Sequence, residues 1–130
     1  GGFKEKKYQA KPYKYELPGG AQVLVGRNNK ENDFLTFKLS SSKDIWLHTK
    51  DIPGSHVILR GFDKAAHEPD EKTIYAAASI AAYYSKARGS ENVPVDYVPI
   101  KYVKKPQGAK PGMVVFTNNR TVWVNPKLPQ

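Results

Sequence analysis

The stretch DIWLHTKDIPGSHVILR, residues 44–60, decides the fold expected for this chain. Its two ends, Ile45 to Thr49 and His56 to Arg60, are rich in branched and apolar residues, and the sequence KDIPGS joins them. Runs of this kind on either side of a Pro-Gly turn are typical of strands. We therefore interpret the stretch as two strands connected by a turn.

The two strands divide their side chains between two faces, because successive residues of a strand point to opposite sides. Ile45 and Leu47 of the first strand, with Val57 and Leu59 of the second, supply the core side. If the strands pair, the opposite surface displays a group of polar and aromatic side chains: Asp44, Trp46, His48, His56 and Arg60.

This polar surface suits a nucleic acid. Tryptophan and histidine rings stack on unpaired bases, and Arg60 can pair with a phosphate. Asp44 can anchor a histidine or accept a hydrogen bond from a ribose hydroxyl, and the turn 53–55 can offer backbone N–H groups to a phosphate. The alternative is that Trp46 is a core residue beneath a helix and that both histidines are structural groups bonded to backbone. The residues alone leave both interpretations open.

A metal site or a hydrolytic site is a further alternative for the same residues. His48 and His56, with Asp51 or Asp44, could supply two imidazoles and one carboxylate. However, their spacing matches no known ligand signature, and Ser55 lies in no strand-turn-helix elbow of the kind that carries a nucleophile. We therefore expect no metal, no cofactor and no catalytic residue.

Five further runs read as strands: Tyr13 to Glu16, Ala21 to Arg27, Val95 to Val103, Met113 to Thr117 and Thr121 to Asn125. The turn signal Leu17-Pro18-Gly19-Gly20 makes the first two a hairpin. Asn118-Asn119-Arg120 makes the last two a hairpin as well, because asparagine tolerates positive φ. Pro99 places the strand between these hairpins at a sheet edge or at a bulge.

Two helices are expected. A short one starts at Asn28 or Asn29 and carries Glu31 in its first turn, although the alternation that follows in residues 35–39 also fits a strand. A long, Ala-rich helix runs from about Glu71 to Ala87. Its expected contacts with a sheet are Ile74, Ala77, Ala78, Ala81 and Tyr84. Together these elements predict an α+β domain with a mainly antiparallel sheet of about seven short strands.

Composition and charge reduce the number of functions that this chain could have. The 130 residues are enough for one domain with a real core, and the absence of cysteine excludes disulfides and thiolate zinc sites. No apolar run is long enough to span a bilayer, so we expect no membrane insertion. Residues 1–15 carry a net charge of +4 and residues 101–130 carry +6, whereas the 85 residues between them carry −1. Basic ends on a neutral body indicate a polyanion partner, unless they only keep the chain soluble.

Two polar clusters outside the opening stretch support a polyanion partner. In GRNNKEND, Arg27 and Asn28 stand at the start of the short helix, an arrangement that can bind an anion, although capping alone explains the asparagine. IKYVKKPQGAKPGMV is a lysine-rich loop with aromatic residues, typical of RNA binding, although it can also be merely solvated. Its candidate contacts are Lys101, Lys104, Lys105 and Lys110.

Three stretches, GRNNKENDFLTFKLS, DIWLHTKDIPGSHVILR and VPVDYVPIKYVKKPQGAKPGMVVF, resemble the NFACT-R domain of the RqcH/NEMF family, whose bacterial members are often called fibronectin-binding proteins. The resemblance covers about residues 13–126. It leaves residues 1–12 as a Lys-rich linker and 127–130 as a tail, and the chain as a domain excised from a longer protein.

The resemblance implies a cytoplasmic RNA-binding module without enzymatic activity. Family members bind large ribosomal subunits obstructed by peptidyl-tRNA and recruit charged tRNA for template-free tailing of the stalled peptide. The implied partners are therefore tRNA and the rRNA of the large subunit. A second hypothesis is an adhesin or protein-interaction domain that binds fibronectin, and a third is a metal-dependent hydrolase or nuclease.

Overall fold

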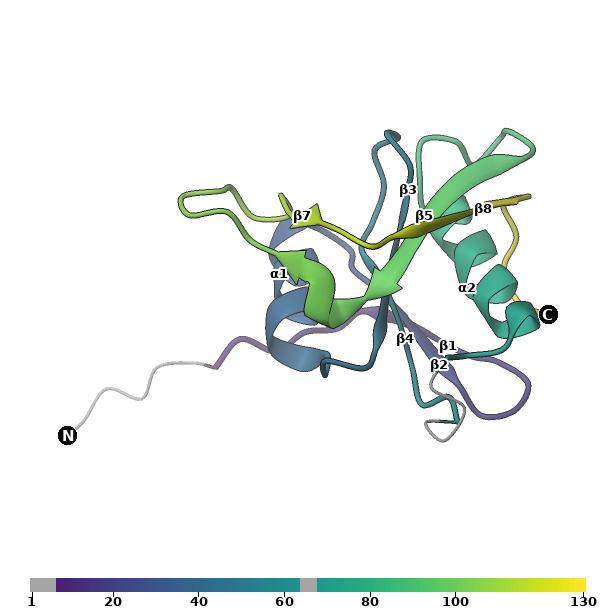
Figure 1. Cartoon of the computed structure of the whole chain (residues 1–130), viewed down its shortest axis with the longest axis horizontal. Helices are drawn as coiled ribbons and strands as arrows, with labels where there is room; N and C mark the ends of the chain where they lie inside the picture. The colour runs from purple at the N-terminus through teal and green to yellow at the C-terminus, as the bar shows by residue number, and fades with distance from the viewer. Residues whose placement is uncertain (1–6, 64–67) are drawn as a thin grey trace.

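The computed structural model describes residues 7–63 and 68–130, and Figure 1 shows one antiparallel sheet with a helix packed on each side. Residues 1–6 of the expected linker lie outside this description. The elements in chain order are β1 (Tyr13–Glu16), β2 (Gln22–Val25), α1 (Asn29–Phe34), a π-helical turn (Leu35–Leu39), β3 (Ile45–Thr49), β4 (Val57–Arg60), α2 (Glu71–Tyr83), β5 (Val93–Pro99), a 3-10 turn (Ile100–Tyr102), β6 (Val103–Lys104), β7 (Val115–Phe116) and β8 (Arg120–Val124).

The six-stranded sheet has the order β1-β2-β4-β3-β5-β8, and β6 and β7 pair separately. All pairs are antiparallel. The expected α+β class is therefore confirmed. The first hairpin is confirmed too, because Gly19 and Gly20 both adopt the positive φ that its turn requires.

Each face of the sheet is covered, which gives the molecule two hydrophobic clusters. Ile45, Leu47, Val57 and Leu59 pack against α2, as their alternation predicted. On the opposite face, Trp46 and Ile58 pack against Leu35 of the π-helical turn and Val103 of β6, among other apolar residues. This second cover explains why the supposed polar face of β3 is not open to solvent.

Helix α2 begins as expected and ends earlier. The side chain of Asp70 caps it by accepting a hydrogen bond from the N–H of Thr73. The small residues Ala77, Ala78 and Ala81 are buried against the sheet. The helix stops at Tyr83 because the next residues bond to the turn between β3 and β4: Ser55 N–H donates to the Tyr84 carbonyl.

Two strand predictions are wrong. The strand containing Pro99 lies between β3 and β8, not at an edge, and Pro99 is its last residue, beyond the last residue paired with β8. The missing N–H therefore costs no bond to β8. The predicted final hairpin does not form either, because β7 pairs with β6 whereas β8 pairs with β5. Asn118 does adopt positive φ, but it links two sheets.

Candidate nucleic-acid interface

The expected Trp-His surface lies beneath the molecular surface. Trp46 is 1% exposed, His56 2% and Asp44 2%. Trp46 therefore offers no ring face to a base, and the prediction that it is displayed on a surface is wrong. The physical reason is the second cover: Phe116 of β7 lies 4.9 Å from the indole ring, centroid to centroid. The alternative, a core tryptophan, is confirmed, but under the π-helical turn and β6–β7 and not under the long helix.

His56 joins three segments beneath this cover. Its Nε2 lies 3.0 Å from the Gly112 carbonyl, so that nitrogen donates, and its Nδ1 therefore accepts from the Thr36 hydroxyl at 2.8 Å. The backbone N–H of His56 donates to Oδ1 of Asn32 in α1. Burial lowers the pKa of His56 to about 4, and the nearby His48 ring acts in the same direction. The imidazole is thus neutral at pH 7 and ties the start of β4 to the π-helical turn and to the loop around Gly112, while the backbone N–H of His56 bonds α1.

His48 is half-buried beside the same indole. Its ring stacks on Trp46 at 5.7 Å between centroids, and its Nδ1 donates to the Thr49 carbonyl at 2.6 Å. Burial lowers the pKa of His48 as well. Neither histidine of this stretch therefore carries the positive charge at neutral pH that would attract phosphate.

Arg27 forms an anion site whose anion belongs to the chain itself. Glu31, fully buried, accepts from Arg27 Nε at 2.9 Å, from Arg27 Nη2 at 2.8 Å and from the backbone N–H groups of Arg27 and Lys11. Asn28 caps the helix by accepting from the N–H of Glu31. The predicted anion-binding arrangement exists, but a carboxylate of α1 fills it. The outer part of the Arg27 side chain, 38% exposed, remains accessible.

The lysine-rich loop between β6 and β7 is clamped onto α1. Asp33 holds it at two points: one oxygen accepts from the Gly112 N–H at 2.8 Å, and the other pairs with Lys105 Nζ at 2.9 Å. Lys105 also donates to the Lys110 carbonyl within the loop. Figure 1 shows the loop projecting beyond α1, on the side of the molecule away from α2. A loop held at its base in this way presents its remaining lysines in a defined position.

We call the exposed cations of α1 and this loop the α1 basic surface: Arg27, Lys30, Lys104, Lys105 and Lys110. Within residues 7–63 and 68–130, Lys104, Lys110 and Lys30 form no ion pair. Lys30 lies over the Tyr8 ring at 4.5 Å, so the lysine-rich N-terminal segment also reaches this side. Lys30 was not among the RNA contacts predicted from the sequence, although its place directly after the two asparagines at the helix start could have indicated it.

Asp44, Arg60 and Lys101 are not part of the α1 basic surface. Asp44 accepts from the Ser41 N–H, so it shapes the turn before β3, and Arg60 lies 4.0 Å from it. Arg60 is at the far end of β4 from His56, roughly 13 Å away along a strand. Lys101 faces a separate cavity. Of the basic residues proposed from the sequence, only Arg27 and the lysines of the loop between β6 and β7 therefore lie on the α1 basic surface.

The described residues contain no group of three His, Cys, Asp or Glu side chains placed to hold a metal ion. The two-histidine, one-carboxylate alternative thus finds no support in this part of the chain. Within the same residues, no helix has the length and apolar character to cross a membrane.

Comparisons with known proteins point to one family. The model of the NFACT protein RNA binding domain matches residues 11–118. Two curated relatives are both called Rqc2 homolog RqcH. The one from Bacillus subtilis (strain 168) is 55% identical over 112 residues, which is 86% of this chain and 19% of that protein. The one from Streptococcus suis (strain 05ZYH33) is 39% identical over an alignment 132 positions long, which covers 96% of this chain and 23% of that protein.

A solved structure agrees with the sequence relatives. The C-terminal part of the fibronectin/fibrinogen-binding protein from Streptococcus suis superimposes with a TM-score of 0.84 at 40% identity. The match covers 95% of this chain and 49% of that one. By comparison, the chain spans only about a fifth of the length of the two curated relatives named above.

Proposed function

The chain belongs to the NFACT-R family of RNA-binding domains, and from this membership we propose that it binds tRNA and ribosomal RNA through the α1 basic surface. One observation carries the choice of surface. The loop with Lys104 and Lys110 is clamped by Asp33 and His56, so these two ammonium groups, which have no carboxylate partner among the residues that the structure describes, stay close to one another. Fixed, unpaired cations are what a phosphate backbone binds.

We propose different roles for the candidate residues according to their exposure and their partners. Lys30, Lys104 and Lys110 are free to contact phosphate, and Arg27 can offer the accessible part of its guanidinium. Lys105 serves mainly to hold the loop, through Asp33. Trp46, His48 and His56 support the surface from below as positioning residues, whereas Asp44 shapes the turn before β3. This assignment changes the role of the buried residues and leaves Arg60 and Lys101 outside the α1 basic surface.

For the whole protein we propose a role in ribosome-associated quality control in the cytoplasm. Two relatives carry the name Rqc2 homolog RqcH, and the family resemblance implies binding to obstructed large subunits and recruitment of tRNA for C-terminal tailing. This chain corresponds to about a fifth of such a protein. It would supply RNA contacts and no catalysis, so the isolated domain should bind RNA without extending a peptide.

The test is the affinity of the domain for bulk tRNA at several salt concentrations. We expect log K to fall steeply with log salt, and Lys104→Ala with Lys110→Ala to weaken binding and reduce the slope by about 1.5–2, because each lysine neutralises roughly one phosphate. Both side chains are exposed and outside ion pairs, so thermal unfolding should stay within ~0.5 kcal/mol of the wild type.

A matched control removes two lysines on the α2 side, Lys86→Ala with Lys127→Ala, and should leave affinity nearly unchanged. Equal losses in both double variants would mean nonspecific attraction by net charge and would contradict the choice of surface. Fibronectin belongs in the same assay as the second candidate partner, because the solved relative is a fibronectin/fibrinogen-binding protein. Tighter binding of fibronectin than of tRNA at physiological salt would favour that alternative.

A further inference from the structure

A cavity of about 870 Å³ extends from α2 to Lys101 and Tyr102, which directly precede β6 and the clamped loop. It opens between α2, the ends of β5 and β8, and the segment before β3. Its floor is apolar, formed by Ile45, Ile74 and Val122, and tyrosine rings stand around it. The size falls within the range of small-molecule sites, about 300–1,000 Å³. An apolar floor with aromatic walls suits a flat ring.

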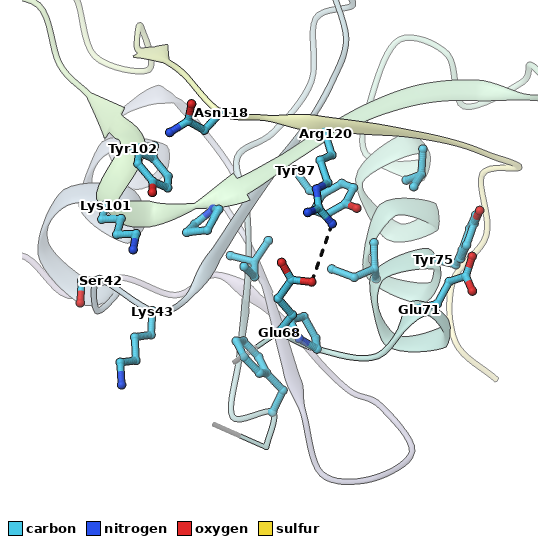
Figure 2. A pocket seen from close by; sticks show the side chains of 16 residues that line it. Ser42, Lys43, Glu68, Glu71, Tyr75, Tyr97, Lys101, Tyr102, Asn118 and Arg120 are labelled. Atoms are coloured by element: carbon cyan, nitrogen blue, oxygen red, sulfur yellow. Dashed lines mark ion pairs between the residues drawn. The ribbon is translucent and has the colours of Figure 1, made fainter. Parts of the chain in front are cut away.

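The charged groups of this cavity are separated into two ends. Lys43 and Lys101 lie together at one end, beside Tyr102, and Glu71 lies with Tyr75 at the other, as Figure 2 shows. Glu68 and Arg120 face each other between these ends at 3.7 Å. Both of these side chains are about two-thirds exposed, so their ion pair is weak and open to exchange. A ligand with an anionic part and a part that donates hydrogen bonds is complementary to this arrangement.

We propose that this cavity binds one unpaired nucleotide of the RNA and prefers a base with an exocyclic amine, an inference that rests on the RNA-binding function proposed above. The phosphate would lie at Lys43 and Lys101, and the ring would stack on tyrosine. A carboxylate only accepts hydrogen bonds, so it accepts from the N4 amine of cytosine and repels the O4 carbonyl of uracil. Glu68, between the two ends, is the first candidate acceptor, and Glu71 at the far end is the second.

Continuity with the α1 basic surface supports an RNA strand as the source of that nucleotide. Lys101 lines the cavity, and Lys104 of the clamped loop is only three residues further along the chain. A single strand that lies on the loop can thus place the next nucleotide beside Lys101. Unpaired bases are the parts of RNA that proteins splay out and read in this way.

The test compares a cytidine ten-mer with a uridine ten-mer, two pyrimidine oligonucleotides of the same length and charge, by fluorescence anisotropy at pH 7.5. We expect the wild-type domain to bind the cytidine oligomer at least several-fold more tightly. Glu68→Gln, alone or with Glu71→Gln, should bring the ratio of the two affinities close to one, because the amide can both donate and accept. Equal affinity in the wild type, or an unchanged ratio in the double variant, would overturn the proposal.

A second set of variants separates this cavity from the α1 basic surface. Tyr75 is 40% exposed on α2, so Tyr75→Ala should leave folding intact while weakening both oligomers about fivefold or more through lost stacking. If Tyr75→Ala and Lys43→Ala bind like the wild type while Lys104→Ala with Lys110→Ala loses affinity, the cavity proposal is wrong and the RNA-binding function stands. If the wild type binds neither oligomer nor tRNA, both proposals fail.

Discussion

At the scale of single residues, buried polar side chains build the basic surface without touching its partner. Glu31 has no exposure, yet it fixes Arg27 and the segment around Lys11 through four hydrogen bonds. His56 does the same for the loop at Gly112. The fold favours the charged form of Glu31 and the neutral form of His56. Because both forms are lost when the groups take up a proton, both residues make the fold sensitive to acid.

The Glu31 carboxylate should contribute stability that disappears at low pH. The Arg27 hydrogen bonds hold the pKa of Glu31 at about 2, below its ordinary 4.5. A lowered acid pKa stabilises the fold fully above pH 4.5, and this contribution is lost as pH falls from 4.5 toward 2. Its size is about 3 kcal/mol. Urea unfolding of Glu31→Gln should show that loss already at pH 7, and a wild-type stability at pH 7 would contradict the role given to Glu31.

Protonation of the His56 imidazole should lower the stability of the fold at higher pH than protonation of Glu31 does. Its pKa is about 4 in the folded chain, against 6.5 ordinarily, because burial disfavours the cation. The unfolded state therefore takes up the proton first, and stability falls as pH drops from 6.5 to 4, by about 2.5 kcal/mol between pH 7 and pH 4.5. His56→Gln, which does not titrate, should be less stable at pH 7 but show a flatter profile in this range. If the free energy of unfolding of this variant fell with pH as steeply as that of the wild type, another group would be responsible for the acid sensitivity.

At the scale of elements, the loop between β6 and β7 depends on α1 for its position. The helix is short, six residues, and a π-helical turn extends it directly. Its Asn32 and Asp33 side chains accept hydrogen bonds from the backbone N–H groups of His56 and Gly112, and its Asn29 side chain lies beside Gly112. The two-residue strands β6 and β7 pack over Trp46, but such a short hairpin is marginal by itself, so α1 is needed to fix the loop between them.

Gly112→Ala tests this dependence. Gly112 has a φ of +87°, and an added Cβ would lie 2.8 Å from Oδ1 of Asn29 in α1. We expect the loop to leave the helix, the tRNA affinity to fall several-fold, and the His56 Nε2–H signal in NMR to shift as its carbonyl partner moves. Gly108→Ala is a matched control, since Gly108 has a φ of +76° but no atom within 4 Å of the added Cβ. Equal effects of both substitutions would mean that backbone strain alone matters.

At the scale of the whole molecule, charge follows the division of the sheet into two covered faces. The side with α1 carries the loop lysines, Lys30 and the start of the described N-terminal segment. The last residues run along α2 instead, where the Lys127 N–H donates to the Ser79 carbonyl. The six positive charges of residues 101–130 are therefore divided between two sides of the molecule. Of these six residues, only Lys104, Lys105 and Lys110 belong to the α1 basic surface.

The sequence by itself determined the local structure of this protein. Alternation in residues 44–60 identified the core side of β3 and β4, the Pro-Gly-Gly turn identified the first hairpin, and Asp70 with the alanines identified α2 and its buried face. These features follow from periods of two and 3.6 residues and from turn chemistry, which act between near neighbours. The lysine-rich loop was likewise visible as composition.

Only the tertiary structure decided which polar residues are buried and which strands pair. A period of two shows that Trp46 and Leu47 face opposite sides, but it does not show that Phe116, seventy residues later, covers the indole. Nor could it show that Glu31 supplies the anion for Arg27, or that β7 pairs with β6 and leaves β8 to β5. Such pairings depend on the free energy of burying two distant faces together, and that quantity belongs to the folded chain and not to any one segment.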